Sequence, residues 1–540
     1  MAEKRLKVED LNLAQQEALC VLVSEDRNLI VLGEAGTGKS EIIRMGARLY
    51  TLNVERQGRR DVGCKITAPY GMAASKLEGD TVDTLFPELV GLTCTKTCEK
   101  ILRARLKQSP DLERWRVIRC LCLLVIDEAS TLTATKLRVL DAAFRVIRGS
   151  DTSFMGGVRV MLCGDFLQLD PVENDEKLYL HQVMREGEFK LVTLTENMRQ
   201  SEDRFRNLLG RVRIASPTAE DVELLTSLSG SRPSESLASS DVLQICGTKL
   251  FAKEMNSARY RQLVEREHAF HAVVRWKDGE GDEWATAKVR DAGSVAVKSD
   301  WLKAQLRDLR KEECVRSTAD CALKIGSRVM LNRNLYAYAD RMMRNGRVGT
   351  VVSLNHPADD FDTATEAVLS ATAFAEVRFD DAPDRPIRIA PALLRRAKGQ
   401  LVAEVWCMPL TLAWAVTVYK SQGCEVDQVV VRCDDLSSPK QVYVALSRCR
   451  NLDGVALVGF DASSICPLSP EDAEFHRFLD RHERRWDYKT GLPKARSEPS
   501  AREMAAGEPS GTNRENRSER SRKRKKGSER NDAKKRKRGK

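Results

Sequence analysis

Eight consecutive residues near the start of the chain have the types and spacing of a phosphate-binding loop. They fit the pattern G-x-x-x-x-G-K-[ST], and they lie between an apolar strand-like run at 28–32 and a helical pattern that begins at Lys39. Glycines let backbone N–H groups face phosphate oxygens, the Lys39 cation reaches the β- and γ-phosphates and assists catalysis, and a hydroxyl at Ser40 ligates Mg²⁺. We therefore predict that ATP and Mg²⁺ are bound by Gly33, Glu34, Ala35, Gly36, Thr37, Gly38, Lys39 and Ser40.

Two adjacent carboxylates follow an uninterrupted apolar run at 121–126. Apolar residues without alternation predict a strand that is buried on both faces, and ligands of such sheets bind at the carboxyl ends of the strands. Asp127 is predicted to hold Mg²⁺ through water, and Glu128 to orient and deprotonate the attacking water. The loop and the carboxylate pair together predict hydrolysis of a nucleoside triphosphate.

The elements that must position these residues form two sets of strand-like runs separated by helical patterns. Such alternation predicts parallel α/β sheets. The first set is 28–32, 64–68, 121–126, 158–163 and 191–194, and the second is 241–246, 410–418, 428–432 and 455–460.

A third kind of segment interrupts the second set. Short β-like runs at 324–331 and 347–354 are separated by the turn signal Asn345-Gly346, which predicts a small all-β insertion. Residues 216–240 and 355–372 have the composition of loops. After Tyr488 the chain is rich in Ser, Gly, Pro, Arg and Glu, which predicts disorder.

Composition limits the classes of protein that need to be considered. The 540 residues are 42% hydrophobic and 31% charged, which is typical of a globular protein of several domains. Residues 511–540 contain 15 Lys or Arg and 4 Asp or Glu; this net +11 equals the charge of the whole chain. The 15 cysteines include no C-x-x-C pair, which favours free thiols in a reducing compartment. Apolar runs are far shorter than the about 20 residues that span a bilayer, so we expect an intracellular protein without a membrane segment.

Further short motifs follow one another in a fixed order. They are 11–16, 67–74, 79–86, 164–172, 196–200, 202–213, 412–423 and 441–448, and they are accompanied by the β-like segments 323–331 and 345–351. The β-like segments lie after the first six of these motifs and before the last two. Together with the phosphate loop, the motifs and segments resemble the Pif (petite integration frequency) helicases of superfamily 1B. The resemblance covers roughly residues 11–484. Each motif alone is moderately specific, whereas eight in register are very specific.

The resemblance implies an α/β fold with two RecA-like P-loop motor domains, parallel sheets, and a small Src-homology-three-like β-barrel inserted in the second domain. The expected boundaries are 1–195 for the first domain with the phosphate loop and the carboxylate pair, 196–322 and 410–488 for the two parts of the second domain, 323–409 for the barrel, and 489–540 for a disordered basic tail.

The resemblance also implies roles for individual residues. Gln15 would read adenine, Gln168 would sense the γ-phosphate, and Gly423 would contribute to nucleotide binding. Arg199 and Arg448 would be cations of the second domain that reach the phosphates when the two domains close, because a planar guanidinium suits the charge of the transition state. DNA contacts are expected from Thr67, Pro69, Gly71, Asp83, Arg213, Tyr419, Lys420, Ser421, Gln441 and Arg450, whereas Trp414 and Tyr443, among apolar neighbours, are expected in the core.

Four positions depart from the family pattern: Tyr70 and Asp83 stand where Thr and His are usual, and Asp170 and Tyr419 where Pro and His are usual. A tyrosine in place of histidine keeps an aromatic face. Carboxylates beside a nucleic-acid track repel phosphate, so Asp83 and Asp170 are expected to weaken DNA affinity or its coupling to the ATP site.

The resulting hypothesis is a monomeric, Mg²⁺- and ATP-dependent DNA helicase that moves 5′ to 3′ on single-stranded DNA and acts on forked DNA in replication, repair, recombination or telomere maintenance. The alternatives are an RNA-directed superfamily 1B helicase and a DNA-stimulated ATPase switch with little unwinding. Two basic clusters predict a bipartite nuclear signal read by import receptors, or else a nonspecific nucleic-acid arm; they are Arg522, Lys523, Arg524, Lys525 and Lys526, and Lys534, Lys535, Arg536, Lys537 and Arg538.

Overall fold

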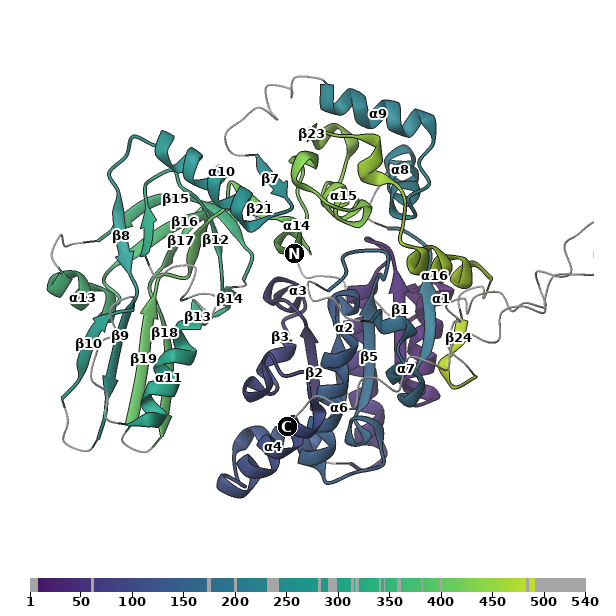
Figure 1. Cartoon of the computed structure of the whole chain (residues 1–540), viewed down its shortest axis with the longest axis horizontal. Coiled ribbons are helices and arrows are strands. Elements are labelled where there is room, and N and C mark those ends of the chain that lie inside the picture. The colour runs from purple at the N-terminus through teal and green to yellow at the C-terminus, as the bar shows by residue number, and fades with distance from the viewer. Residues whose placement is uncertain are drawn as a thin grey trace, which may run out of the picture. The chain divides into compact units, whose positions relative to one another are not determined.

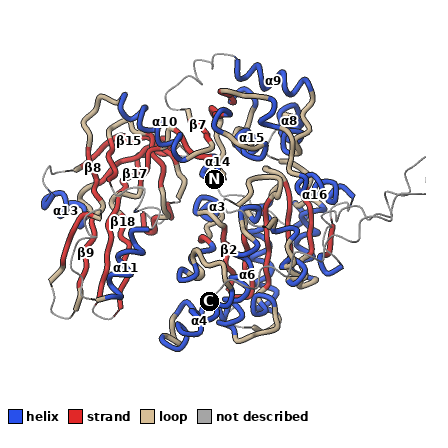
Figure 2. Tube along the Cα trace, in the orientation of Figure 1, coloured by secondary structure: helices blue, strands red, loops and turns tan. Residues whose placement is uncertain are grey.

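The computed structural model describes most of residues 8–490 (Figures 1 and 2), and these residues lie in one compact unit. The described ranges are 8–59, 63–171, 176–198, 202–230, 242–279, 283–289, 299–311, 315, 320–338, 341–343, 345–356, 361–380, 382–398, 401–422, 424–481 and 485–490. None of the helices in these ranges has both the length and the apolar character needed to cross a bilayer.

A seven-stranded sheet forms the centre of the first α/β domain. All of its strands are parallel except β24, the last in the sequence, which pairs antiparallel with β6 at one edge. The spatial order is β24 (Arg485–Asp487), β6 (Lys190–Leu194), β1 (Leu29–Gly33), β5 (Arg159–Gly164), β4 (Leu121–Ile126), β2 (Gly63–Ala68) and β3 (Asp80–Thr81).

Side chains that alternate along these strands build two separate cores, one on each face of the sheet. On β1, Leu29 and Val31 pack into one core while Ile30 and Leu32 pack into the other. The first core is covered by α1 (Leu13–Leu19) and α2 (Lys39–Arg56). The second is covered mainly by α4 (Thr95–Gln108), α5 (Glu113–Cys120), α6 (Ala134–Arg148), α7 (Val183–Glu186) and α16 (Pro470–Arg481), and the short α3 (Gly71–Lys76) follows β2.

A four-stranded, fully parallel sheet forms the second α/β domain. Its order is β21 (Ala415–Thr417), β7 (Leu243–Cys246), β22 (Val429–Arg432) and β23 (Val455–Val458). The helices of this domain are α8 (Asp203–Arg213), α9 (Ala219–Gly230), α10 (Lys249–Gln262), α14 (Val418–Ser421) and α15 (Pro439–Leu446).

Antiparallel strands form the insertion between β7 and β21. One sheet has the order β17 (Ala382–Ile389), β16 (Phe374–Phe379), β15 (Val348–Asn355), β12 (Arg328–Leu331) and β20 (Leu410–Leu412). A second has the order β10 (Ala285–Lys288), β9 (Val273–Lys277), β19 (Leu401–Cys407) and β18 (Ala392–Lys398). The described residues of the insertion also form the strand pairs β8 (His268–His271) with β11 (Asp320–Leu323) and β13 (Leu335–Tyr338) with β14 (Arg341–Met343), and the helices α11 (Asp300–Lys311) and α13 (Phe361–Leu369).

The strand pairing differs from the expected boundaries in two places. The insertion begins before residue 323. β8 pairs with β11, and β9 pairs with β19, so strands that precede residue 323 already belong to the insertion. The second domain ends before its expected boundary at residue 488. β24 joins the first sheet, and Phe475, Phe478 and Tyr488 pack into the core of the first domain.

Two segments expected as loops contain helices. α9 begins with reciprocal bonds in which Thr218 N–H donates to the Asp221 carboxylate at 2.9 Å and Asp221 N–H donates to the Thr218 hydroxyl at 3.2 Å. This Thr-x-x-Asp pattern is a helix-start signal that was present in the sequence. α13 buries Ala367 and Val368 in the core of the insertion, and nothing local in the sequence announces that packing.

Candidate functional site

The phosphate loop lies between β1 and α2, at the carboxyl edge of the first sheet. Gly36 and Gly38 have φ of 91° and 83°, which a residue with a Cβ rarely adopts, so the backbone turns tightly into the start of α2. The Lys39 ammonium donates to the carbonyls of Gly33 at 2.6 Å and Glu34 at 2.8 Å, and therefore lies over the loop. Ser40 is the next residue of α2, so its hydroxyl is available at the same helix end.

Three segments hold the loop from outside. The buried Gln15 amide donates to Thr37 O at 3.2 Å, while its oxygen accepts from Asn12 N–H at the start of α1. The chain after β6 lies on the other side, where the Asn197 amide donates to Glu34 and to Ala35 O, and Met198 N–H donates to Gly36 O. From the second domain, the Tyr443 hydroxyl accepts from Ala35 N–H at 3.5 Å.

The carboxylate pair lies two strands from the loop, at the end of β4. Asp127 is 7% exposed and its N–H donates to Thr67 O at 2.8 Å. Glu128 has φ 52° and ψ 42°, a left-handed conformation that costs a residue with a Cβ about 1–3 kcal/mol. Burial raises the pKa of the Cys163 thiol well above its usual range, and both Asp127 and Lys39 act on that thiol. The loop after β1 and the carboxylates after β4 flank the end of β5, because both strands pair with β5, Leu32 with Gly164 and Ile126 with Leu162.

A turn after β5, residues 165–170 and here called the sensor turn, carries Gln168. Gln168 is 4% exposed, and its amide donates to the Asp165 carboxylate at 3.3 Å. Arg213 of α8 donates to both oxygens of Asp165, at 2.8 and 2.7 Å. Burial opposes ionisation of Asp165, but the Arg213 guanidinium outweighs it and holds the pKa of Asp165 below its usual range. The expectation that Arg213 contacts DNA is corrected: this side chain is 17% exposed and is committed to Asp165.

Helix α15 leads to Arg448, the expected catalytic cation of the second domain. Arg448 is 3% exposed, and it donates to Val444 O at 2.8 Å and to the Ser447 hydroxyl at 2.8 Å. The same helix carries Tyr443, so the element that ends near Arg448 already contacts the phosphate loop. Tyr443 and Trp414 are 1% and 3% exposed, as expected for core residues.

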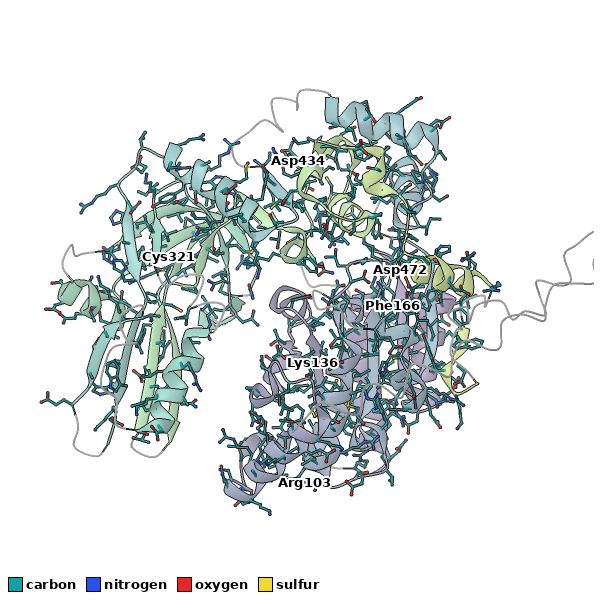
Figure 3. The ribbon with its side chains drawn as sticks, viewed as in Figure 1. Arg103, Lys136, Phe166, Cys321, Asp434 and Asp472 are labelled. Atoms are coloured by element: carbon teal, nitrogen blue, oxygen red, sulfur yellow. The ribbon has the colours of Figure 1, made fainter. Side chains whose placement is uncertain are left out.

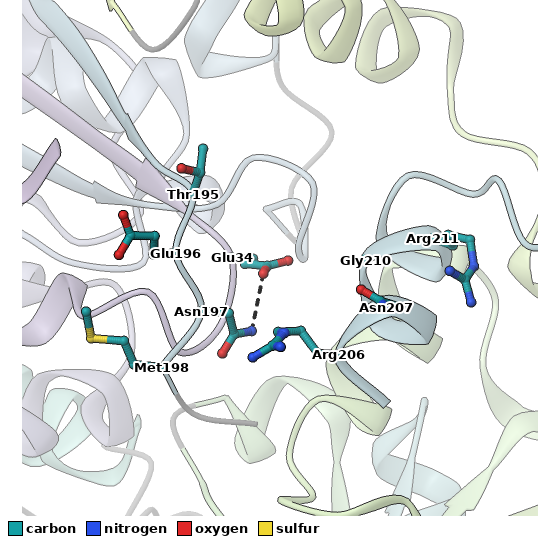
Figure 4. Close-up of a pocket in the computed structure, with 9 residues that line it drawn as sticks. All are labelled: Glu34, Thr195, Glu196, Asn197, Met198, Arg206, Asn207, Gly210 and Arg211. Carbon is teal, nitrogen blue, oxygen red and sulfur yellow. Dashed lines mark hydrogen bonds between the residues drawn. The ribbon is translucent and has the colours of Figure 1, made fainter. Parts of the chain in front are cut away.

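A cavity of about 660 Å³ opens beside Glu34 of the loop, and Lys39, Ser40 and Asp127 are not among the residues that line it. Figure 4 shows Asn197 bonded to Glu34 at one wall and α8 on the other side. The residues that line it are Glu34, Thr195, Glu196, Asn197, Met198, Arg206, Asn207, Gly210 and Arg211.

Three parts of the chain meet at the expected DNA track. The rings of Tyr70, after β2, and Tyr419, in α14, lie edge to face with centroids 6.3 Å apart. A Cβ at Gly71 would lie 2.5 Å from the Asn345 amide nitrogen, so the turn of the insertion also reaches this place. Pro69 and Lys420 are half-buried beside these residues.

Several residues expected on the track are bonded within the protein. The buried hydroxyls of Thr67 and Ser421 donate to Val125 O and Val418 O at 2.8 Å, so these side chains stabilise the fold rather than face a strand. Asp83 forms an ion pair with Lys136, which balances its charge. Gln441 accepts from Ser437 N–H at 2.8 Å. Arg450 is 53% exposed and lies 3.0 Å from Asp427.

The remaining expected site residues, Arg199, Gly423, Arg522–Lys526 and Lys534–Arg538, lie outside the described part of the chain. The sequence prediction also missed residues that the structure brings to the site. Asn197 and Asp165 lay within quoted motifs, so a signal existed for them. Lys440 and Asp472, which contact the sensor turn or its partners, had no such signal.

Comparison with known proteins supports one family. The family model for PIF1-like helicases matches residues 9–211, which include the loop, the carboxylate pair, the sensor turn and most of α8. The chain is similar to this family over these residues. The ATP-dependent DNA helicase Pif1 of Bdellovibrio bacteriovorus is 28% identical over 483 residues, covering 87% of this chain and 93% of that protein. The chain spans between 47% and 69% of the other curated Pif1-like relatives compared.

Solved structures of Pif1 helicases share the fold. The Candida albicans Pif1 helicase has a TM-score of 0.66 at 22% identity, with 87% of this chain and 99% of that chain covered. The Bacteroides Pif1 bound to single-stranded DNA has a TM-score of 0.60 at 23% identity, with 88% of this chain and 99% of that chain covered. The Pif1-like architecture of two α/β domains with an insertion is therefore shared.

The Arg213–Asp165 pair gives a test of the corrected assignment. Arg213→Ala leaves a buried carboxylate without its guanidinium, so we expect the free energy of unfolding to fall by about 3–5 kcal/mol. Chemical denaturation of the full chain measures this. Arg206→Ala is the matched control on the same helix, because the side chain of its partner Asp203 is 78% exposed and the expected loss is about 1 kcal/mol or less. Unchanged stability of Arg213→Ala together with weaker DNA binding would restore the DNA-contact assignment.

Proposed function

We propose that this Pif1-like chain is an ATP-dependent DNA helicase that moves 5′ to 3′ on single-stranded DNA and separates forked duplexes. The observation that carries the proposal is the convergence of a phosphate loop, a strand-end carboxylate pair and groups of a second α/β domain on one site. Arg213 and Tyr443 come from that second domain: Arg213 donates to Asp165 beside Gln168, and the Tyr443 hydroxyl accepts from Ala35 N–H of the loop. The direction of movement rests on the family resemblance.

The residues present fit ATP with Mg²⁺. The loop N–H groups and Lys39 would hold the phosphates, and the Ser40 hydroxyl and Asp127 carboxylate are the oxygen ligands that Mg²⁺ prefers. When bound, the ion neutralises charge on the phosphate oxygens. Glu128 would orient the attacking water, and Gln168 would sense the γ-phosphate. Arg448 would stabilise the transferred phosphoryl group as the two domains close, which joins hydrolysis to a change in domain separation.

The expected track supports DNA as the polymer. Tyr70 and Tyr419 present aromatic rings next to the turn that contains Asn345, and aromatic side chains are platforms on which bases of single strands stack. The Bacteroides relative with the same fold is bound to single-stranded DNA. A forked substrate would then be opened as the motor advances along one strand.

Strand separation with ATP and Mg²⁺ tests the function and its direction together. We expect unwinding of a duplex with a 5′ single-stranded tail and not of one with a 3′ tail. Lys39→Ala and Arg448→Ala should abolish it, because each removes a cation from the phosphates. Lys190→Ala is the control. Lys190 pairs with Glu25 at the end of β6 that is away from the phosphate loop, so this substitution should leave unwinding unchanged.

Other outcomes of the same assay point to other functions. ATP hydrolysis on DNA without strand separation would contradict the helicase and favour a DNA-stimulated switch. Greater stimulation by RNA than by DNA would favour an RNA-directed motor, and unwinding of the 3′-tailed duplex alone would reverse the direction.

We also propose that the protein acts in the nucleus, in DNA replication, repair, recombination or telomere maintenance, and that import receptors read its basic tail. Two basic clusters separated by seven residues support a bipartite signal. A fluorescent protein fused to residues 511–540 should accumulate in nuclei of cultured eukaryotic cells, and neutralising Lys534–Arg538 should abolish this. Uniform distribution of the unmodified fusion would contradict the import assignment.

A further inference from the structure

Lys440 is a buried cation that contacts the sensor turn. It is the second residue of α15 and is 5% exposed. Its ammonium lies 3.1 Å from Phe166 O, 2.8 Å from the Asp170 carboxylate and 2.8 Å from the Asp472 carboxylate. An ammonium has three N–H donors, and these three acceptors match them in number.

The acceptors come from two separate pieces of the first domain. Phe166 and Asp170 lie on either side of Gln168 in the sensor turn. Asp472 lies in the first turn of α16, where it also accepts from the Tyr179 hydroxyl at 3.0 Å. Phe166 and Asp472 are labelled in Figure 3, and the ring of Phe475, which lies in α16 with Asp472, is 5.8 Å from that of Phe166. The site for the Lys440 ammonium is therefore built by packed residues.

Charges within this cluster are balanced. Lys177 lies 2.7 Å from Asp170 and 3.6 Å from Asp472, so two carboxylates face two ammonium groups. Burial opposes ionisation of Asp472, but Lys440 and Lys177 outweigh it and hold the pKa of Asp472 below its usual range. Asp170 also accepts from the Tyr419 hydroxyl through its backbone carbonyl, at 3.4 Å. Asp170 is thus engaged by two protein cations, which balance the charge that is expected to weaken DNA affinity or its coupling to the ATP site.

Residues at both ends of α15 belong to the same candidate ATP site. Lys440 at its start contacts the turn that holds Gln168, Tyr443 contacts the phosphate loop, and Arg448 lies two residues beyond its end. A shift of α15 along the sensor turn would change the distance between Gln168 and Arg448. A misplacement of about 1 Å in such a constellation costs up to about a hundredfold in rate.

We propose that Lys440 is a positioning residue for ATP hydrolysis: through Phe166 O, Asp170 and Asp472 it holds the sensor turn in register with α15, so that Gln168 and Arg448 address the same phosphate. This inference rests on the proposed ATPase activity. Among the described contacts, Lys440 touches no residue of the phosphate loop, so we expect its loss to affect turnover rather than ATP binding.

Steady-state ATP hydrolysis by the full chain on single-stranded DNA tests this role. Lys440→Met keeps the aliphatic stem and removes the charge, and we expect kcat to fall at least about tenfold while KM for ATP stays within about twofold. Lys440→Arg should recover part of kcat. Lys489→Met is the control, because Lys489 forms an exposed ion pair with Glu188 and should leave both constants unchanged.

Asp170→Asn supplies a milder variant, because Lys440 keeps Phe166 O and Asp472. Its kcat should lie between those of the wild type and Lys440→Met, and the double variant should be no slower than Lys440→Met, since both act through one contact. Wild-type kcat in Lys440→Met, or full additivity in the double variant, would overturn the inference alone. A wild-type chain without ATPase activity would overturn the proposed function and this inference with it.

Discussion

Two cations of the second α/β domain, the half-buried Arg213 and the buried Lys440, contact one turn of the first. Arg213 donates to Asp165 at the start of the turn, and Lys440 binds Phe166 O and Asp170 farther along it. A buried charge without its partner is costly, so these two contacts fix which faces of the domains meet. The same arrangement brings Tyr443 to the phosphate loop. Gln168 lies between the residues of the turn that Arg213 and Lys440 contact.

The layers of the first domain explain why the chemical groups collect at one edge. Parallel strands place their carboxyl ends together, so the loop after β1, the carboxylates after β4 and the turn after β5 lie side by side. The second domain contributes its groups through helices α8 and α15. A site built from two domains responds to their separation, and this is the physical basis for connecting hydrolysis to movement along a strand.

Local patterns made much of this predictable. The phosphate loop, the β4 strand with Asp127 and Glu128, and the alternation of strands depend on neighbouring residues, so the sequence shows them directly. Arg213 was expected to contact DNA because the family resemblance implied it, and nothing in the local sequence indicates its partner 48 positions away. Lys440 and Asp170 are 270 positions apart, and only the folded chain brings them together. The return of α16 and β24 to the first domain was missed for the same reason.

The central claim is that the rate of ATP hydrolysis by this Pif1-like chain depends on nucleic acid bound between its domains. The most direct measurement is the rate of ATP hydrolysis by the wild-type chain with Mg²⁺, in the absence and presence of saturating single-stranded DNA. The account predicts that DNA raises kcat at least about tenfold, because a bound strand stabilises the closed arrangement of sensor turn, α15 and loop. An equal rate with and without DNA would contradict it.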